Sequence, residues 1–155
     1  ARIYSGTDGA TLDTFFVLRG DGSPIDGTAE NFQQIASAIN KSLASEKVAQ
    51  SQQRIARTLR SFELPTDISF SMDDDRQLTI MELSAADRPG LLAQIALVIS
   101  QHDVAIQAAK IQTLGERVED IFFLNTGNSG ELLDAELCDT LKTNLCTAID
   151  EGLAA

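Results

Sequence analysis

Apolar and polar residues alternate along residues 66–72 and again along residues 78–83, with three aspartates between the two stretches. A period of two is typical of a strand that buries one face, and Asp is a common turn residue. The pattern therefore predicts an antiparallel hairpin. Adjacent carboxylates such as Asp73, Asp74 and Asp75 also attract hard cations. Successive turn residues point in different directions, however, so we favour the turn over a metal site.

Helical spacing of apolar residues follows this hairpin twice. The first predicted helix has its apolar side formed by Leu91, Leu92, Ile95, Ala96 and Ile99. The last predicted helix carries Leu133, Leu137, Leu141, Leu145 and Ile149 on one face. Strand-like segments at residues 104–113 and 118–125 lie between these helices.

An internal repeat links the start of the chain to this region. Residues 1–5 (ARIYS) match residues 109–113 (AKIQT), and residues 13–17 (DTFFV) match residues 120–124 (DIFFL). The first copy thus predicts strands at residues 1–5 and 12–18. A helix follows from about Ala29, with Thr28 as N-cap, and continues to about residue 59 before Pro65 ends it. Its apolar face comprises Phe32, Ile35, Ala36, Ile39 and Leu43.

The order strand, helix, strand, strand, helix in the second copy predicts an α+β, ferredoxin-like fold. Its antiparallel sheet has both helices on one face, and residues 66–72 supply the edge strand from the N-terminal side. We expect residues 1–46 to be the C-terminal part of a first domain, residues 47–65 a connector and residues 66–155 a second domain. The first copy lacks an opening strand and helix, so it should pack on the second copy or on another chain, as in a homodimer.

Charge is unevenly distributed along the 155 residues, which have a net charge of −11. Residues 1–65 carry seven basic and seven acidic side chains, and residues 66–155 carry five basic and sixteen acidic ones. This excess disfavours nucleic acid and anionic membranes as partners. The connector is basic, with Lys47, Arg54, Arg57 and Arg60, and is interpreted as a solvated linker helix against the acidic domain or, alternatively, as a partner-binding patch.

No apolar run approaches the ~20 residues of a membrane span, and the N-terminus is unlike a secretory signal. Cys138 and Cys146 lie about 12 Å apart along one predicted helix, too far for a disulfide. We therefore expect reduced thiols and a cytoplasmic location.

Catalytic motifs are missing from the sequence. His102 is the single histidine, and its place at a predicted helix end favours an interaction with the helix dipole over a role as a base. No phosphate-binding or nucleophile-elbow string occurs. We expect no catalytic residue and no metal site.

The segment from Asp87 to Leu92 is the best candidate for a site. It connects a strand to a helix, where free N–H groups and the helix dipole can hold a carboxylate. Gly90 permits close approach of a ligand, and Pro89 suits a first helical turn. The Asp87 carboxylate could cap the helix or bind an ammonium group. Such a site fits a free amino acid, although Asp-x-Pro-Gly is also an ordinary helix start.

Residues 86–96 (ADRPGLLAQIA) and 109–122 (AKIQTLGERVEDIF) resemble an ACT domain. They are most similar to the second ACT domain at the C-terminal end of a bifunctional enzyme of bacterial nitrogen regulation. Residues 1–9, 12–15 and 20–25 resemble the latter part of the first ACT domain of that enzyme, and residues 62–66 resemble the segment between the two.

The resemblance implies an amino-acid sensor, with glutamine as ligand, that switches upstream catalytic domains between modifying and demodifying a small signalling protein. Those upstream domains are expected to use magnesium. The ligand residues implied by the family are Asp87, Arg88, Pro89, Gly90, Leu91, Leu92, Lys110, Ile111, Gln112 and Asp120. A shared structural role for Asp120 remains open, because Asp13 occupies its place in the first copy. The alternatives are an ACT module that only dimerises, or one that regulates another amino-acid-responsive enzyme.

Overall fold

The computed structural model describes residues 1–6, 10–45 and 64–154, apart from the side chains of residues 152–154. The chain divides into two compact units. The larger unit comprises residues 1–14 and 51–155, and the smaller one residues 15–50. The domain boundaries expected from the sequence remain a prediction.

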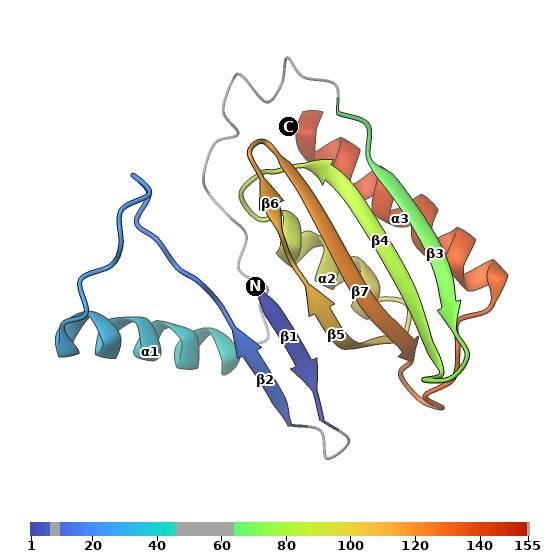
Figure 1. Ribbon diagram of the computed structural model, residues 1–155, viewed down its shortest axis with the longest axis horizontal. Coiled ribbons are helices and arrows are strands. Elements are labelled where there is room, and N and C mark those ends of the chain that lie inside the picture. Colours follow the sequence, from blue (N-terminus) through green and yellow to red (C-terminus); the bar gives the residue numbers. More distant parts are fainter. Residues whose placement is uncertain (7–9, 46–63, 155) are drawn as a thin grey trace. The chain divides into compact units, whose positions relative to one another are not determined.

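The second copy forms the predicted split βαβ arrangement (Figure 1). Its elements are β3 (Asp67–Asp73), β4 (Leu78–Ala86), α2 (Leu91–Ser100), β5 (Val104–Lys110), β6 (Thr113–Leu114), β7 (Arg117–Thr126) and α3 (Ala135–Ala154). The strands lie in the order β5-β7-β4-β3, all antiparallel, and β6 pairs with β7. The hairpin and the edge strand β3 are thus confirmed. The fold is α+β and compatible with the ferredoxin-like class.

The hydrophobic core lies between this sheet and the helices α2 and α3. Alternate residues of β4 and β7 point into it, among them Met81, Leu83, Phe122 and Leu124, which are all 1% exposed or less. The predicted face of α3 is confirmed for Leu141, Leu145 and Ile149, which are buried, and for Leu137, which is partly buried. Leu133 is also buried but lies before α3, which begins at Ala135, so its predicted place on the helix is wrong. The predicted face of α2 needs one correction. Ala96 is exposed and Val98 is buried, because Val98 follows Leu91 and Ile95 at helical spacing and Ala96 does not.

The repeated strands pair with each other. β1 (Arg2–Ser5) lies between β2 (Thr11–Thr14) and β5, antiparallel to both. Arg2 pairs with Lys110, which holds the equivalent position in the second copy, and Ile3 pairs with Ala109. Backbone bonds also join Ala1 and Ile111. Ala1 thus pairs with the equivalent of Ile3, and Ile3 pairs with the equivalent of Ala1. Strands β1 and β5 are therefore related by a local two-fold axis.

Two predicted strands are shorter than the pattern indicated. The strand expected at residues 12–18 ends at Thr14, and beyond it Leu18 makes only an isolated bridge with Pro24. In the described part of the chain β2 has a partner on one side only, whereas its equivalent β7 lies between β5 and β4. The strand expected at residues 104–113 ends at Lys110, and Thr113 belongs to β6. Within β5, a β-bulge between Ile106 and Ala108 shifts the register of its pairing with β7.

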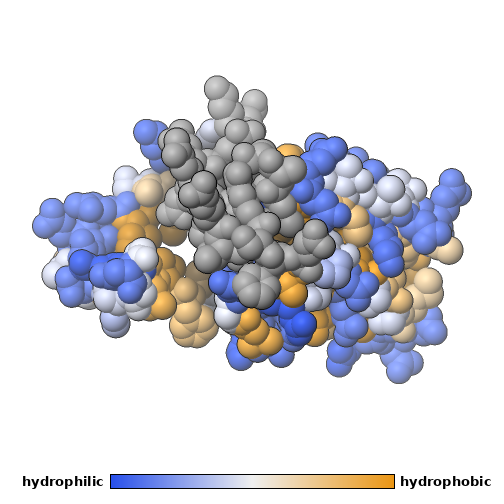
Figure 2. Space-filling model, turned by 90° about the horizontal axis from the view of Figure 1, so that it is seen from above, coloured by the Kyte–Doolittle hydropathy of each residue, from blue (hydrophilic) through white to orange (hydrophobic). Residues whose placement is uncertain are grey.

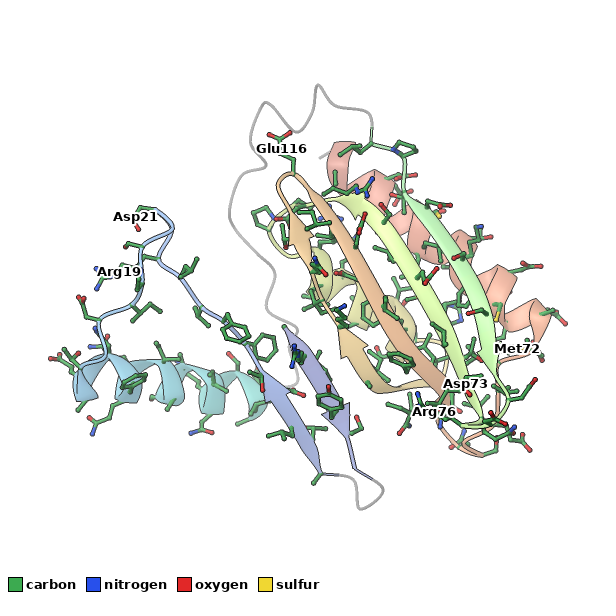
Figure 3. The ribbon with its side chains drawn as sticks, in the orientation of Figure 1. Arg19, Asp21, Met72, Asp73, Arg76 and Glu116 are labelled. Carbon is green, nitrogen blue, oxygen red and sulfur yellow. The ribbon has the colours of Figure 1, made fainter. Side chains whose placement is uncertain are left out.

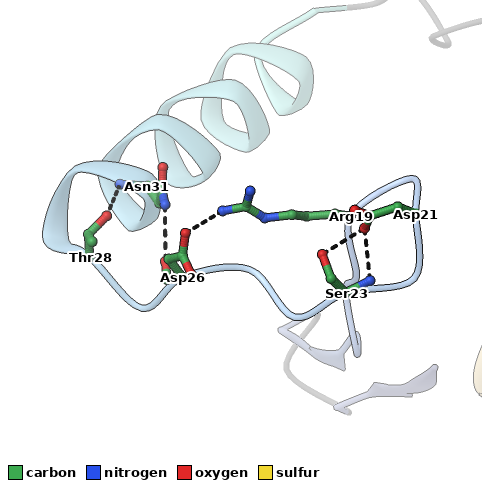
Figure 4. Close-up of polar contacts among 6 residues, drawn as sticks. All are labelled: Arg19, Asp21, Ser23, Asp26, Thr28 and Asn31. Carbon is green, nitrogen blue, oxygen red and sulfur yellow. Dashed lines mark hydrogen bonds and ion pairs between the residues drawn. The ribbon is translucent and has the colours of Figure 1, made fainter.

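The smaller unit contains a polar loop followed by α1 (Ala29–Leu43). Arg19 forms an ion pair with Asp26 at 2.5 Å, and Asp21 accepts hydrogen bonds from Ser23 (Figure 4). Thr28 caps the helix as predicted, accepting a bond from the Asn31 N–H at 3.3 Å.

The apolar side of α1 is not covered by the described residues of its own unit. None of the residues of α1 is buried, and Figure 2 shows hydrophobic surface beside hydrophilic surface on this unit. The helix ends at Leu43. Its predicted continuation to residue 59 falls mostly on residues 46–63, which lie outside the described residues, as does the basic connector.

Two further features are absent from the described ranges. No helix there is long and apolar enough to cross a membrane. Among the same residues, no group of three or more His, Cys, Asp or Glu side chains is arranged to hold a metal ion.

Candidate functional site

The loop between β4 and α2 has the backbone that the sequence predicts for close ligand approach. Gly90 is the N-cap residue of α2 and adopts a left-handed conformation, with φ of 84°. A residue with a side chain is strained there, which explains the glycine. No side chain caps α2. The Asp87 carboxylate therefore does not serve as the cap that the sequence offered as one of its two roles.

The loop is anchored to the turn between β6 and β7. The Asp87 N–H donates a hydrogen bond to the Glu116 carbonyl oxygen at 2.8 Å. Glu116 lies at one end of the sheet, and Asp73 and Arg76 of the β3–β4 turn lie at the other (Figure 3). The candidate site therefore occupies the end of the sheet where Glu116 lies.

Asp120 is a buried carboxylate at this end of the sheet. Its side chain is 3% exposed and lies on the buried face of β7, between the core residues Val118 and Phe122. Its Oδ1 accepts a hydrogen bond from the Gln112 N–H at 3.0 Å. Burial raises the pKa of Asp120 from 3.8 to about 6, while the bond from Gln112 and the Ala1 amino group lower it and the charge of Asp87 raises it. The charge of Asp87 is the smallest of these causes, so burial is the main reason for the raised pKa of Asp120.

The site borders the seam between the two copies. The Ala1 amino group donates to the Ile111 carbonyl oxygen at 2.9 Å, and the Ile111 N–H donates to the Ala1 carbonyl oxygen at 3.1 Å. The next residue, Gln112, bonds to Asp120 through its N–H and accepts from the Glu119 N–H through its carbonyl. Ile111, Gln112 and Asp120 are therefore brought together where β1 meets β5.

The structure distributes the other predicted ligand residues differently. Lys110 is exposed and follows the buried Ala109, so its side chain lies on the sheet face opposite to Asp120. Arg88 is 9% exposed and its guanidinium bonds to Gln94 and to the Ile149 carbonyl in α3. Leu91 is buried in the core, and Pro89 and Leu92 are partly buried.

The aspartates of the hairpin, His102 and the two cysteines were the other residues with possible chemistry. Residues 74–77 form the hairpin turn, and Asp73 accepts a bond from the Arg76 N–H at 3.1 Å. His102 follows the end of α2, and its Nε2 contacts the Asn144 amide nitrogen at 2.9 Å. Cys138 and Cys146 are free thiols.

An acidic depression of about 420 Å³ lies at the open side of β3, β4 and β7 and was not predicted. Its lining includes Asp67, Ser69, Glu82, Ser84, Arg117 and Glu119. Arg117 forms an ion pair with Glu119, which neutralises part of this charge.

Two contributors to the candidate site carry no signal in the sequence. Glu116 acts through its backbone carbonyl, which any residue could supply. Gln94 bonds with both ends of its side-chain amide, to Arg88 and to the Ala148 carbonyl. A partly exposed glutamine on a helix is common, so only its partners reveal a role.

Comparison with known proteins found curated bacterial relatives that share one name. The bifunctional uridylyltransferase/uridylyl-removing enzyme of Pseudomonas entomophila (strain L48) is 37% identical over 157 residues, which is 100% of this chain and 17% of that protein. Proteins of the same name from Ectopseudomonas mendocina (strain ymp) and Stutzerimonas stutzeri (strain A1501) are 39% and 40% identical, over 99% and 92% of this chain. The chain spans 16 to 17% of the length of these relatives. No family model and no solved structure matches it.

Proposed function

Since the chain is homologous along its whole length to a segment of the bifunctional uridylyltransferase/uridylyl-removing enzymes, we propose that it is the regulatory C-terminal region of such an enzyme. Its two copies are an incomplete and a complete ACT unit. The split βαβ topology of the second copy and the repeated strand pair support this proposal.

The ligand of this region is a free amino acid, and glutamine is the candidate that the ACT resemblance implies. The observations that carry the proposal are the buried Asp120, whose pKa the charge of Asp87 helps to raise, and the uncapped N-terminus of α2. The two carboxylates would bind the ammonium group of the amino acid. The N–H groups at the start of α2 would bind its carboxylate. Both charges of a zwitterion would thereby be matched.

Regulation would follow from the place of the site at the seam. A ligand that contacts the Asp87 loop and the Gln112 segment would favour one arrangement of β1 against β5. The ligand would shift the equilibrium between the two arrangements by no more than the difference between its binding free energies for them. The modifying and demodifying activities would belong to upstream catalytic domains, which would use magnesium and act on a small nitrogen-regulatory protein. The chain itself would contribute no catalytic residue and would work as a homodimer.

Isothermal titration of glutamine at pH 7.5 tests the sensing proposal, on this chain and on the longer enzyme. We expect heat of binding with the wild type and at least tenfold weaker binding for Asp87→Asn, which loses a charge that pairs with the ligand ammonium. Gly90→Leu should also lose binding, because its side chain enters the ligand space at a strained position. Asp74→Asn at the opposite end of the sheet is the matched control and should bind as the wild type does.

A second function is favoured by the pairing of β1 with β5. ACT units that associate through strand edges could serve assembly alone, without a small ligand. Absence of heat with both the chain and the longer enzyme would contradict sensing and favour this association module. Binding of another amino acid in place of glutamine would indicate an ACT regulator of a different response.

A further inference from the structure

Arg88 is a buried cation without a carboxylate partner among the described residues. Its guanidinium donates to the Gln94 side-chain oxygen and, at 3.4 Å, to the Ile149 carbonyl oxygen of α3. Its Nε has no hydrogen-bond partner in the described part of the chain. Burial of an incompletely bonded charge costs free energy, and apolar side chains of similar volume often stabilise such positions. Core packing alone therefore does not explain an arginine here.

Gln94 extends the contact of Arg88 to the next carbonyl of α3. Its Nε2 donates to the Ala148 carbonyl oxygen at 2.6 Å, while its Oε1 accepts from Arg88. The loop that precedes α2 and the first turn of α2 are thereby joined to two consecutive residues near the C-terminal end of α3. A charged donor such as a guanidinium forms a stronger hydrogen bond to a carbonyl oxygen than a neutral donor does.

The same turn of α3 also contacts the start of the second copy. Thr66 donates from its hydroxyl to the Asp150 carboxylate at 2.9 Å, one residue before β3 begins. Residues 148, 149 and 150 of α3 thus contact the candidate loop on one side and the residue where the chain enters β3 on the other. The contacts form a continuous path inside the larger unit.

We propose that Arg88 and Gln94 are positioning residues that hold the Asp87–Gly90 loop in its binding geometry by fastening it to α3. Through Asp150 and Thr66 they also link the loop to the start of β3. This inference rests on the proposed amino-acid site. A loop held before the ligand arrives loses less conformational entropy on binding, so its fastening raises affinity without a ligand contact.

Hydrogen exchange of the ligand-free chain tests the fastening independently of any ligand. Arg88→Met and Gln94→Met remove the polar groups and keep the side-chain length. We expect at least tenfold faster amide exchange at residues 91–94 and 66–70 in both variants. Gln107→Met is the matched control, because it removes another partly buried glutamine amide, bonded to Asn125 in the same sheet. It should leave exchange in both segments unchanged. Wild-type exchange rates in the Arg88 and Gln94 variants would overturn the proposal.

Glutamine titration of the same variants distinguishes positioning from direct contact. If both are positioning residues, each single variant weakens glutamine binding by roughly tenfold. The double variant Arg88→Met/Gln94→Met then binds as well as the more weakly binding of the two single variants. Loss of binding in Arg88→Met with full binding in Gln94→Met would overturn positioning and make Arg88 a ligand contact. If the wild type binds no glutamine, the proposed function fails while the exchange experiment still decides whether the fastening exists.

Discussion

Asp120 shows how one side chain acquires properties that its residue type does not have. A carboxyl group on β7 would ordinarily be ionised well below neutral pH. In the core beside Leu83 and Phe122 it has one backbone donor, from Gln112, and the charge of Asp87 nearby. Its pKa of about 6 lies close to physiological pH. The protonation of this group, and with it the binding of a ligand ammonium group, depends on small changes in its surroundings.

The raised pKa of Asp120 predicts how stability changes with pH. The folded protein holds this proton up to about pH 6, while the unfolded chain loses it near 3.8. The contribution of Asp120 to stability is therefore fully present below about pH 4 and is lost as the pH rises to about 6. Asp120→Asn stays neutral and can still accept the Gln112 bond. Well above pH 6 it should be more stable than the wild type by about 3 kcal/mol, with no gain below about pH 4.

Thermal unfolding followed by circular dichroism from pH 4 to pH 8 measures this difference. Asp74→Asn, which removes an exposed turn carboxylate, is the control and should show no comparable effect. Equal stability of Asp120→Asn and the wild type at pH 7.5 would contradict a buried, unpaired charge at this position.

At the scale of elements, the pairing of β1 with β5 determines where the two copies meet. Backbone bonds and the contact of Ile3 with the core stabilise this pair. The first pair of this ladder, however, places Arg2 directly opposite Lys110. Like charges in this position are destabilising. Repulsion between Arg2 and Lys110 therefore lowers the stability that the backbone bonds give to the β1–β5 pair. A weakened pair is easier for a bound ligand to rearrange.

Lys110→Glu is expected to strengthen the seam, because it replaces cation repulsion opposite Arg2 with attraction. The gain over Lys110→Gln should be about 0.2–1 kcal/mol at low salt, measured by thermal unfolding, and should shrink as salt screens the pair. In an Arg2→Gln background the two variants should be equally stable. A gain that persists there would mean that another group, and not Arg2, faces residue 110.

At the scale of the whole molecule, the two copies share a sequence pattern but differ in burial. Phe122 is fully buried, whereas its equivalent Phe15 is 54% exposed. On the sheet, β2 pairs within the described residues only with β1, and Leu12 on this strand is 70% exposed. An open strand edge with apolar side chains favours pairing with another chain.

We therefore expect the chain to self-associate through β2. Sedimentation should show dimers whose proportion rises with concentration, and Leu12→Lys should lower that proportion, because a charge on an edge strand opposes further pairing. Leu114→Lys removes a comparably apolar, exposed side chain from β6 and should leave association unchanged. A monomer at high concentration would count against this interface.

The sequence by itself determined the elements and the position of the candidate loop. Alternation predicted the β3–β4 hairpin, helical spacing predicted the buried leucines of α3, and the segment from Asp87 to Leu92 predicted the loop that joins β4 to α2. These features depend on interactions between residues close in the chain, which a periodic pattern records directly. The internal repeat further indicated which strands are equivalent.

Only the tertiary structure decided which distant groups meet. It placed Arg2 opposite Lys110, directed Arg88 and Gln94 toward α3, and buried Asp120 while leaving its equivalent Asp13 exposed. It also ended β2 at Thr14, where the same pattern in β7 continues. Burial, partner and pKa depend on contacts that the tertiary fold makes, such as Arg2 with Lys110 and Arg88 with Ile149. A local pattern contains no record of those contacts.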